Sequence, residues 1–337
     1  MTAQRGYDIF EAGDVTLQSG SVFPALKLAY KTYGTLSPAK DNVILYPTSF
    51  SAQHTDIEWL IGPDGVLDPT HYFIIIPNLF GNGLSSSPSN TPAPFPEVSY
   101  HDAVAVQHRL LTERFGISKL ALVYGWSMGG MQAYHWSALH PDMVERAAVV
   151  CGSARCAPYY VFLESVKAAL TADPAFRDGR FLEKPVAGYR AMGRVYAGWA
   201  MSHGFYRDEL WREAGFTSLE DYLVRAWDAT FARRDANDLL AQIGIWQRGD
   251  ISRCGAFAGD LDRALAAIKA HMLLMPGATD RYFDVHDNED ELGKLVNARS
   301  AVLHPIPSLH GHRSGNPINN PRDQAFIKVE IAELLRK

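Results

Sequence analysis

Short apolar runs recur along the chain, and each is about as long as one buried strand. They are rich in Val, Ile and Leu and occupy residues 43–46, 72–76, 120–124, 147–150, 272–275 and 301–303. Stretches with helical spacing of apolar residues separate several of these runs, at 103–115, 128–139 and 288–296. This alternation predicts an α/β fold with a mostly parallel sheet that is covered by helices on both faces.

Two regions depart from the alternation. The opening stretch contains DVTLQSG and ALKLAYKTYGTLSP between Gly, Ser and Pro residues, which favours antiparallel strands leading into the sheet. Residues 157–264 hold few strand-like runs and many segments of helical spacing, broken by Gly and Pro. Because a strand-like run resumes at 271, we interpret 157–264 as a helical cap inserted into one core formed by 1–156 and 265–337.

Composition excludes several classes of protein. The chain has 337 residues with 32 basic and 37 acidic side chains, and its 47% hydrophobic residues are typical of a globular protein. No apolar run approaches the roughly 18 to 20 residues of a membrane span, and no basic stripe suggests a nucleic-acid partner. The N-terminal residues lack the pattern of an export signal, and the three cysteines form no CxxC motif. We therefore expect a cytoplasmic protein.

The sharpest local motif follows the apolar run 120–124. It reads Gly125-Trp126-Ser127-Met128-Gly129, and a helix-like stretch comes directly after it. A serine on a tight strand-to-helix turn brings its flanking residues too close for β-carbons, which explains the two glycines. We predict that Ser127 is a nucleophile and that the backbone N–H of Met128 stabilises an oxyanion. The alternative is that Ser127 merely permits a tight turn.

A serine nucleophile needs a base and a group that orients the base, and in this fold these follow in the order Ser, acid, His. Asp280 comes after the run 272–275, and His312 comes after the run 301–303, so we assign them as acid and base. Asp284 and Asp287 are weaker candidates, because they precede or begin the next helix. His310 is the rival base, and we expect no metal at the His310/His312 pair because a third ligand is not evident.

A second oxyanion donor is expected in the loop after the run 43–46. We choose the N–H of Phe50, with Ser49 as the neighbouring alternative. Cys151 and Cys156 also follow a predicted strand, but free cysteines are more commonly small buried hydrophobes than nucleophiles.

These motifs carry a family resemblance. The chain resembles the homoserine O-acetyltransferase-like branch of the α/β-hydrolase fold in three stretches. They are PNLFGNG, the stretch from FPEVSYHDAVAVQHRLL through GWSMGGMQAYHWSALHPDMVERAAVVCGSA, and FARRDANDLLAQIGIWQRGDIS. The resemblance implies a Ser127, Asp280 and His312 triad, with Met128 and the Phe50 loop as oxyanion hole. It also implies that the helical insertion roofs the pocket and forms a homodimer contact.

Departures from that pattern bear on the substrate. In homoserine acetyltransferases the residue after the catalytic His is typically an Asp associated with the amino group of homoserine, whereas here it is Arg313. A guanidinium beside the acceptor pocket would repel that ammonium group. Trp126, directly before the nucleophile, also departs from the homoserine acetyltransferase pattern. We expect Trp126 and Arg313 to bind substrate.

The sequence therefore favours a serine hydrolase that cleaves short-chain, acetate-like esters of small molecules through an acyl-serine intermediate, with no cofactor. One alternative is an O-acetyltransferase acting on homoserine or another alcohol, for which acetyl-CoA would be a cosubstrate. The other is a non-catalytic binding protein that keeps the fold.

Overall fold

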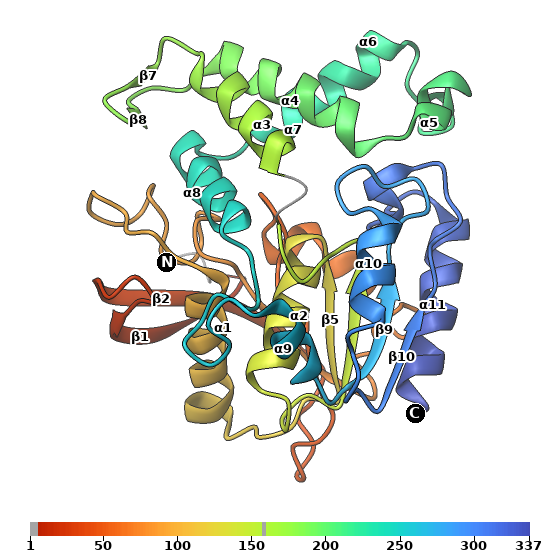
Figure 1. Ribbon diagram of the computed structural model, residues 1–337. Helices are drawn as coiled ribbons and strands as arrows, with labels where there is room; N and C mark the ends of the chain where they lie inside the picture. The colour runs from red at the N-terminus through yellow and green to blue at the C-terminus, as the bar shows by residue number, and fades with distance from the viewer. Residues whose placement is uncertain (1–5, 157–159) are drawn as a thin grey trace.

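The computed structural model describes residues 6–156 and 160–337. Within them, one eight-stranded sheet has the strand order β1-β2-β4-β3-β5-β6-β9-β10 (Figure 1). The two strands from the opening stretch pair antiparallel, β2 pairs antiparallel with β4, and the remaining neighbours are parallel. The strands are β1 (Asp8–Thr16), β2 (Val22–Tyr33), β3 (Val43–Leu45), β4 (Phe73–Pro77), β5 (Leu122–Trp126), β6 (Arg146–Val150), β9 (His271–Met275) and β10 (Ser300–Leu303).

Successive side chains of the central strands enter two different cores, because they point to opposite faces of the sheet. In β3, Val43 and Leu45 join a core with α1 (Tyr100–Arg109) and α2 (Met128–Leu139). Ile44 joins the other core, which contains Ile327, Ile331 and Leu334 of α11 (Pro321–Leu335). Both faces of the sheet are thus covered, and the predicted α/β fold with a mostly parallel sheet is confirmed.

Several elements begin at residues that differ from the predictions. The strand predicted at 120–124 is β5, Leu122–Trp126, because Leu120 forms only an isolated bridge with Val144. The helix predicted from 103 starts at Tyr100, where Ser99 and Asp102 form a capping box, and its last turn, Leu110–Phe115, is π-helical. The helix predicted from 288 is α10 (Val285–Leu292), which begins three residues earlier because Asp284 caps it.

Mainly helical segments lie above the sheet (Figure 1). They are α3 (Tyr160–Thr171), α4 (Val186–Ala200), α5 (His203–Arg207), α6 (Leu219–Tyr222), α7 (Ala229–Ala232) and α8 (Ala236–Gln247), with a short hairpin of β7 (Phe176–Arg177) and β8 (Arg180–Phe181). None of the helices in the described ranges is long and apolar enough to cross a membrane.

The chain leaves for these helices and returns from them at neighbouring points. The backbone N–H of Cys156 donates to the carbonyl of Gly249 at 2.7 Å, and the N–H of Ile251 donates to Ala154 at 3.0 Å. The expected first cap residue, 157, lies outside the described residues. The expected last one, 264, lies within α9 (Leu261–Ala266), where Asp262 forms an ion pair with Lys294 near α10. The division into core and cap stays a prediction.

The Asp238 carboxyl, near the start of α8, is buried and fastens this helix to an early loop. It accepts hydrogen bonds from the backbone N–H of Ser89 at 2.9 Å and from the Ser89 hydroxyl at 2.7 Å. Burial, reinforced by the neighbouring charge of Asp235, raises the pKa of Asp238 to about 6. An unfolded Asp ionises near pH 4, so the folded protein retains a proton between about pH 4 and 6 that the unfolded chain has lost. The contribution of Asp238 to stability therefore falls as pH rises through that window.

We expect Asp238→Asn to remove this part of the pH dependence. The amide can still accept from the Ser89 N–H and can donate to the Ser89 hydroxyl, so both contacts have a partner. The measurement is the urea midpoint of unfolding from pH 4.5 to 7, with the exposed Asp64→Asn as matched control. The midpoint of Asp238→Asn should decline less with pH than that of wild type. Equal slopes in all three proteins would contradict the assignment.

Candidate active site

Ser127 stands at the apex of the turn between β5 and α2. Its backbone has φ 58° and ψ −124°, a conformation that is strained for a residue with a β-carbon. A β-carbon at Gly125 would lie 2.0 Å from the carbonyl oxygen of Gly129, and one at Gly129 would lie 2.6 Å from the carbonyl oxygen of Pro47. Both glycines are therefore required by the close approach of backbone, as the sequence argument expects.

The structure brings Ser127, His312 and Asp280 together. The Ser127 hydroxyl lies 2.8 Å from Nε2 of His312, and Nδ1 of the same ring lies 2.7 Å from Oδ2 of Asp280. The His312 side chain is 4% exposed and the Asp280 side chain is fully buried, so water does not compete strongly for these contacts. We refer to this hydrogen-bonded series as the relay.

The Asp280 carboxylate is held at both oxygens. Oδ2 accepts from His312, while Oδ1 accepts from the backbone N–H groups of Tyr282 at 2.8 Å and Phe283 at 3.3 Å. With Asp280 accepting the Nδ1 proton, the Nε2 lone pair of His312 is directed at the Ser127 hydroxyl.

The rival candidates lie elsewhere. Asp284 caps α10 through the N–H of His286. Nδ1 of His310 lies 3.3 Å from the hydroxyl of Ser308 and 3.2 Å from the amide nitrogen of Asn320. In the described residues neither Asp284 nor His310 contacts the relay.

The predicted oxyanion donors are backbone N–H groups. Within the described ranges, those of Met128, Phe50 and its alternative Ser49 donate no hydrogen bond, whereas the N–H of Ser51 is occupied by the side chain of Gln242 at 2.7 Å. Met128 is the first residue of α2, where unpaired N–H groups and the helix dipole favour negative charge. The Phe50 ring stacks on Tyr196 at 5.7 Å, which fixes its loop against α4.

Trp126 and Arg313 flank the relay. The Trp126 indole N–H donates to the backbone carbonyl of His312 at 3.2 Å, and the two rings stack at 5.1 Å. The Arg313 guanidinium lies over the ring of Trp126, 6.0 Å from the ring centroid. Trp126 thus holds the base in place, a role that the sequence analysis does not foresee. Substrate contact by either residue stays a prediction.

Aromatic side chains around His312 are absent from the sequence prediction. The ring of Tyr282 lies 4.6 Å from that of His312, and Phe283 stacks on it at 5.5 Å. Trp246, from α8, stacks in turn on Phe283 at 5.8 Å. The nearness of Tyr282 and Phe283 to Asp280 in sequence is a usable signal, but Trp246 is brought in by the tertiary fold alone.

Cys151 lies close to two members of the relay. Its sulfur, a carboxylate oxygen of Asp280 and a ring nitrogen of His312 lie within 4.8 Å of one another, a grouping that could hold a metal ion. Burial raises the pKa of the Cys151 thiol well above its usual range, which keeps the sulfur protonated and weakens it as a ligand. Asp280 and His312 already bond each other, so the arrangement fits proton transfer better than metal binding.

Comparison with known proteins assigns the family. Residues 59–311 match the family model of the alpha/beta hydrolase fold. The chain belongs to this α/β-hydrolase family. It is 38% identical to an ethyl acetate hydrolase of Pseudomonas veronii, over 91% of this chain and 89% of that protein. It is 31% identical to a homoserine O-succinyltransferase of Methylibium petroleiphilum, over 88% and 86% of the two chains.

A solved structure extends the likeness to the whole α/β-hydrolase chain. The acetyl esterase MekB superposes with a TM-score of 0.94 at 36% identity, covering 98% of this chain and 97% of that one. Relatives of this α/β-hydrolase include both esterases and acyltransferases. The protein is therefore an enzyme of the ester hydrolase and acyltransferase class. The predicted likeness to the homoserine acetyltransferase-like branch is confirmed.

Proposed function

We propose that this protein hydrolyses short-chain carboxylic esters of small molecules by a two-step acyl transfer through Ser127. The relay is the observation that carries the proposal, because it joins a serine hydroxyl, an imidazole and a buried carboxylate at 2.8 and 2.7 Å. Three such groups in this order are the arrangement that activates a serine near neutral pH.

In the first step, Nε2 of His312 takes the proton of Ser127 as the serine oxygen attacks the ester carbonyl. The N–H groups of Phe50 and Met128 stabilise the negative charge on the carbonyl oxygen. Asp280 stabilises the imidazolium without accepting its proton. The intermediate then breaks its bond to the alcohol oxygen, which receives the proton from His312, and an acyl-serine remains.

In the second step, His312 removes a proton from water as the water oxygen attacks the acyl carbon. The bond to Ser127 breaks, the serine oxygen regains its proton from His312, and the carboxylic acid leaves. An alcohol in place of water would make the same residues a transferase, so the acceptor decides the reaction. Arg313 beside His312 favours hydrolysis over homoserine acetylation, because its charge repels the ammonium group of homoserine. The acetyl esterase and ethyl acetate hydrolase relatives support acetate-like esters.

Two assays test the proposal side by side. We expect acetate release from p-nitrophenyl acetate, a fluorophosphonate adduct on Ser127, and no homoserine-dependent release of CoA from acetyl-CoA. A dominant homoserine-dependent CoA signal would identify an O-acetyltransferase instead. Absence of both turnover and adduct, with a small ligand still bound, would identify a binding protein.

A further inference from the structure

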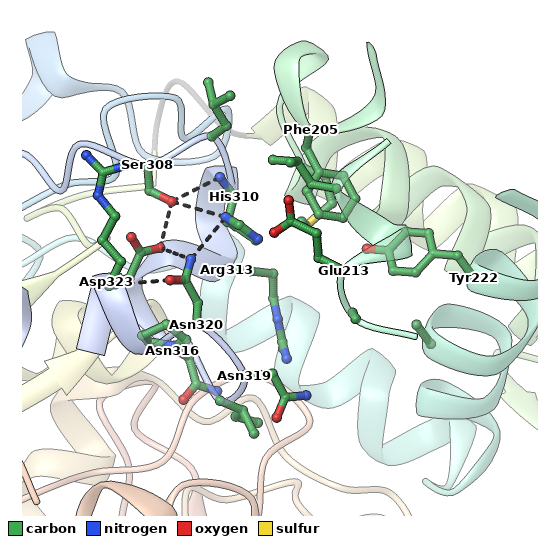
Figure 2. A pocket seen from close by; sticks show the side chains of 18 of the residues that line it. Phe205, Glu213, Tyr222, Ser308, His310, Arg313, Asn316, Asn319, Asn320 and Asp323 are labelled. Carbon is green, nitrogen blue, oxygen red and sulfur yellow. Dashed lines mark hydrogen bonds between the residues drawn. The ribbon is translucent and has the colours of Figure 1, made fainter. Parts of the chain in front are cut away.

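A cavity of about 620 Å³ lies between the helical segments above the sheet and the loop that carries His312 (Figure 2). Its size is within the range of small-molecule sites. The helical segments contribute apolar side chains such as Phe205, Phe216 and Trp227, and the loop contributes Arg313 and Asn316. Neither Ser127 nor His312 lines the cavity, so it is a space beside the relay.

The Arg313 guanidinium has no partner of opposite charge. Across the described parts of the chain its side chain makes no hydrogen bond and no ion pair, and it lies over the ring of Trp126, 6.0 Å from the ring centroid. Its side chain is half-buried, and burial lowers the pKa of its guanidinium, while the nearby side chains of Tyr222 and Tyr282 act in the opposite direction. An arginine in this state remains charged, and a charge removed from water without a partner is costly.

The two acidic side chains of the cavity do not neutralise it. Asp323 accepts hydrogen bonds from the hydroxyl of Ser308 at 2.6 Å and from the amide of Asn320 at 2.8 Å, to the left of Arg313 in Figure 2. Glu213 is exposed and, in the described residues, forms no ion pair with Arg313. The cavity therefore holds a half-buried guanidinium, that of Arg313, which lacks an anion in the described residues.

A second donor points to the same chemistry. The side-chain oxygen of Asn316 accepts the indole N–H of Trp59 at 2.9 Å, which orients the amide and leaves its NH₂ group as a donor. Asn316 is buried and lines the cavity with Arg313. A guanidinium and an amide NH₂ both donate, and the two oxygens of a carboxylate can accept from such donors.

We propose that this cavity binds the carboxylate of an anionic ester, with Arg313 pairing the carboxylate while the acyl group lies at Ser127. The substrates would be acyl esters of hydroxy acids, and the products a short carboxylic acid and a hydroxy-carboxylate. Arg313 follows His312 directly in the chain, and the Trp126 ring lies 5.1 Å from the His312 ring and 6.0 Å from the Arg313 guanidinium, which places the guanidinium near the relay. The inference rests on the proposed esterase activity and adds a charge preference to it.

The test compares acetyl esters of straight-chain ω-hydroxy acids of two to six carbons with their uncharged primary amides. At one or more chain lengths the ratio of kcat/KM, carboxylate over amide, should be about tenfold or more in wild type, the effect of one charge-assisted hydrogen bond. Arg313→Gln should bring the ratio near one, and Arg313→Lys should retain part of it. Arg322→Gln, which changes an exposed arginine of the same cavity, should leave the ratio unchanged.

A binding measurement separates this inference from the proposed function. Calorimetry with the free hydroxy-carboxylates on Ser127→Ala should give affinities about tenfold tighter than on the double variant Ser127→Ala/Arg313→Gln. Ratios at or below one at every chain length, or ratios that Arg313→Gln does not change, would overturn the carboxylate site. If neither these esters nor p-nitrophenyl acetate is hydrolysed, the esterase proposal fails, while the calorimetric difference still decides whether Arg313 binds carboxylates.

Discussion

Ser127→Ala should lower kcat for p-nitrophenyl acetate by roughly ten-thousand-fold to a million-fold, the range for loss of a serine nucleophile. Alanine has no oxygen to attack the ester carbonyl, and no acyl-enzyme can form. The residual rate would come from the N–H groups of Phe50 and Met128, which still stabilise the oxyanion during attack by water. Stopped assays of acetate release at high enzyme concentration measure the remaining rate.

Ser137→Ala is the matched control for this change. Ser137 is also a buried serine, and it lies on the helix that follows the nucleophile. Its hydroxyl donates to the carbonyl of Ala133 within that helix, so its loss should leave kcat within a few-fold of wild type. A Ser127→Ala protein that keeps more than a tenth of wild-type activity would exclude Ser127 as the nucleophile.

His312→Ala should cause a loss of similar size, whereas His310→Ala should retain most of the activity. Only His312 bonds both Ser127 and Asp280, and without it the serine hydroxyl has no base within hydrogen-bonding distance in the described residues. Measuring kcat for p-nitrophenyl acetate in both variants, with circular dichroism spectra to verify folding, decides between the two histidines. Comparable losses in two folded variants would mean that the base is wrongly assigned.

The sequence predicted best those elements whose signal is local. β6 and β9 come from isolated apolar runs between polar residues, and each differs from its predicted start by one residue. The start of α10 was missed because a cap residue, Asp284, determined it rather than the apolar spacing. Local hydrogen bonds of this kind shift an element by a turn without changing the fold.

In the candidate site, too, residues with a local sequence signal could be predicted, and contacts made only by the tertiary fold could not. Ser127 lies in a short motif with a steric reason, and Asp280 and His312 follow from the expected chain order, so all three could be chosen from sequence. The stack of Trp246 on Phe283 and of Phe50 on Tyr196 joins residues far apart in the chain, and no local pattern records it. The homodimer and the cytoplasmic location stay predictions.

The paired backbone at 154–156 and 249–251 has a consequence for how such an enzyme can change. If 157–264 is a cap, as the sequence predicts, the chain enters and leaves it at these hydrogen-bonded neighbours, and a cap of different length or shape can be inserted there without displacing a strand. Under the proposed function, the residues that break the ester bond follow strands of the sheet, whereas part of the cavity that selects the ester is lined by the predicted cap. A change of the predicted cap alone would then alter which ester is bound and leave the relay unchanged.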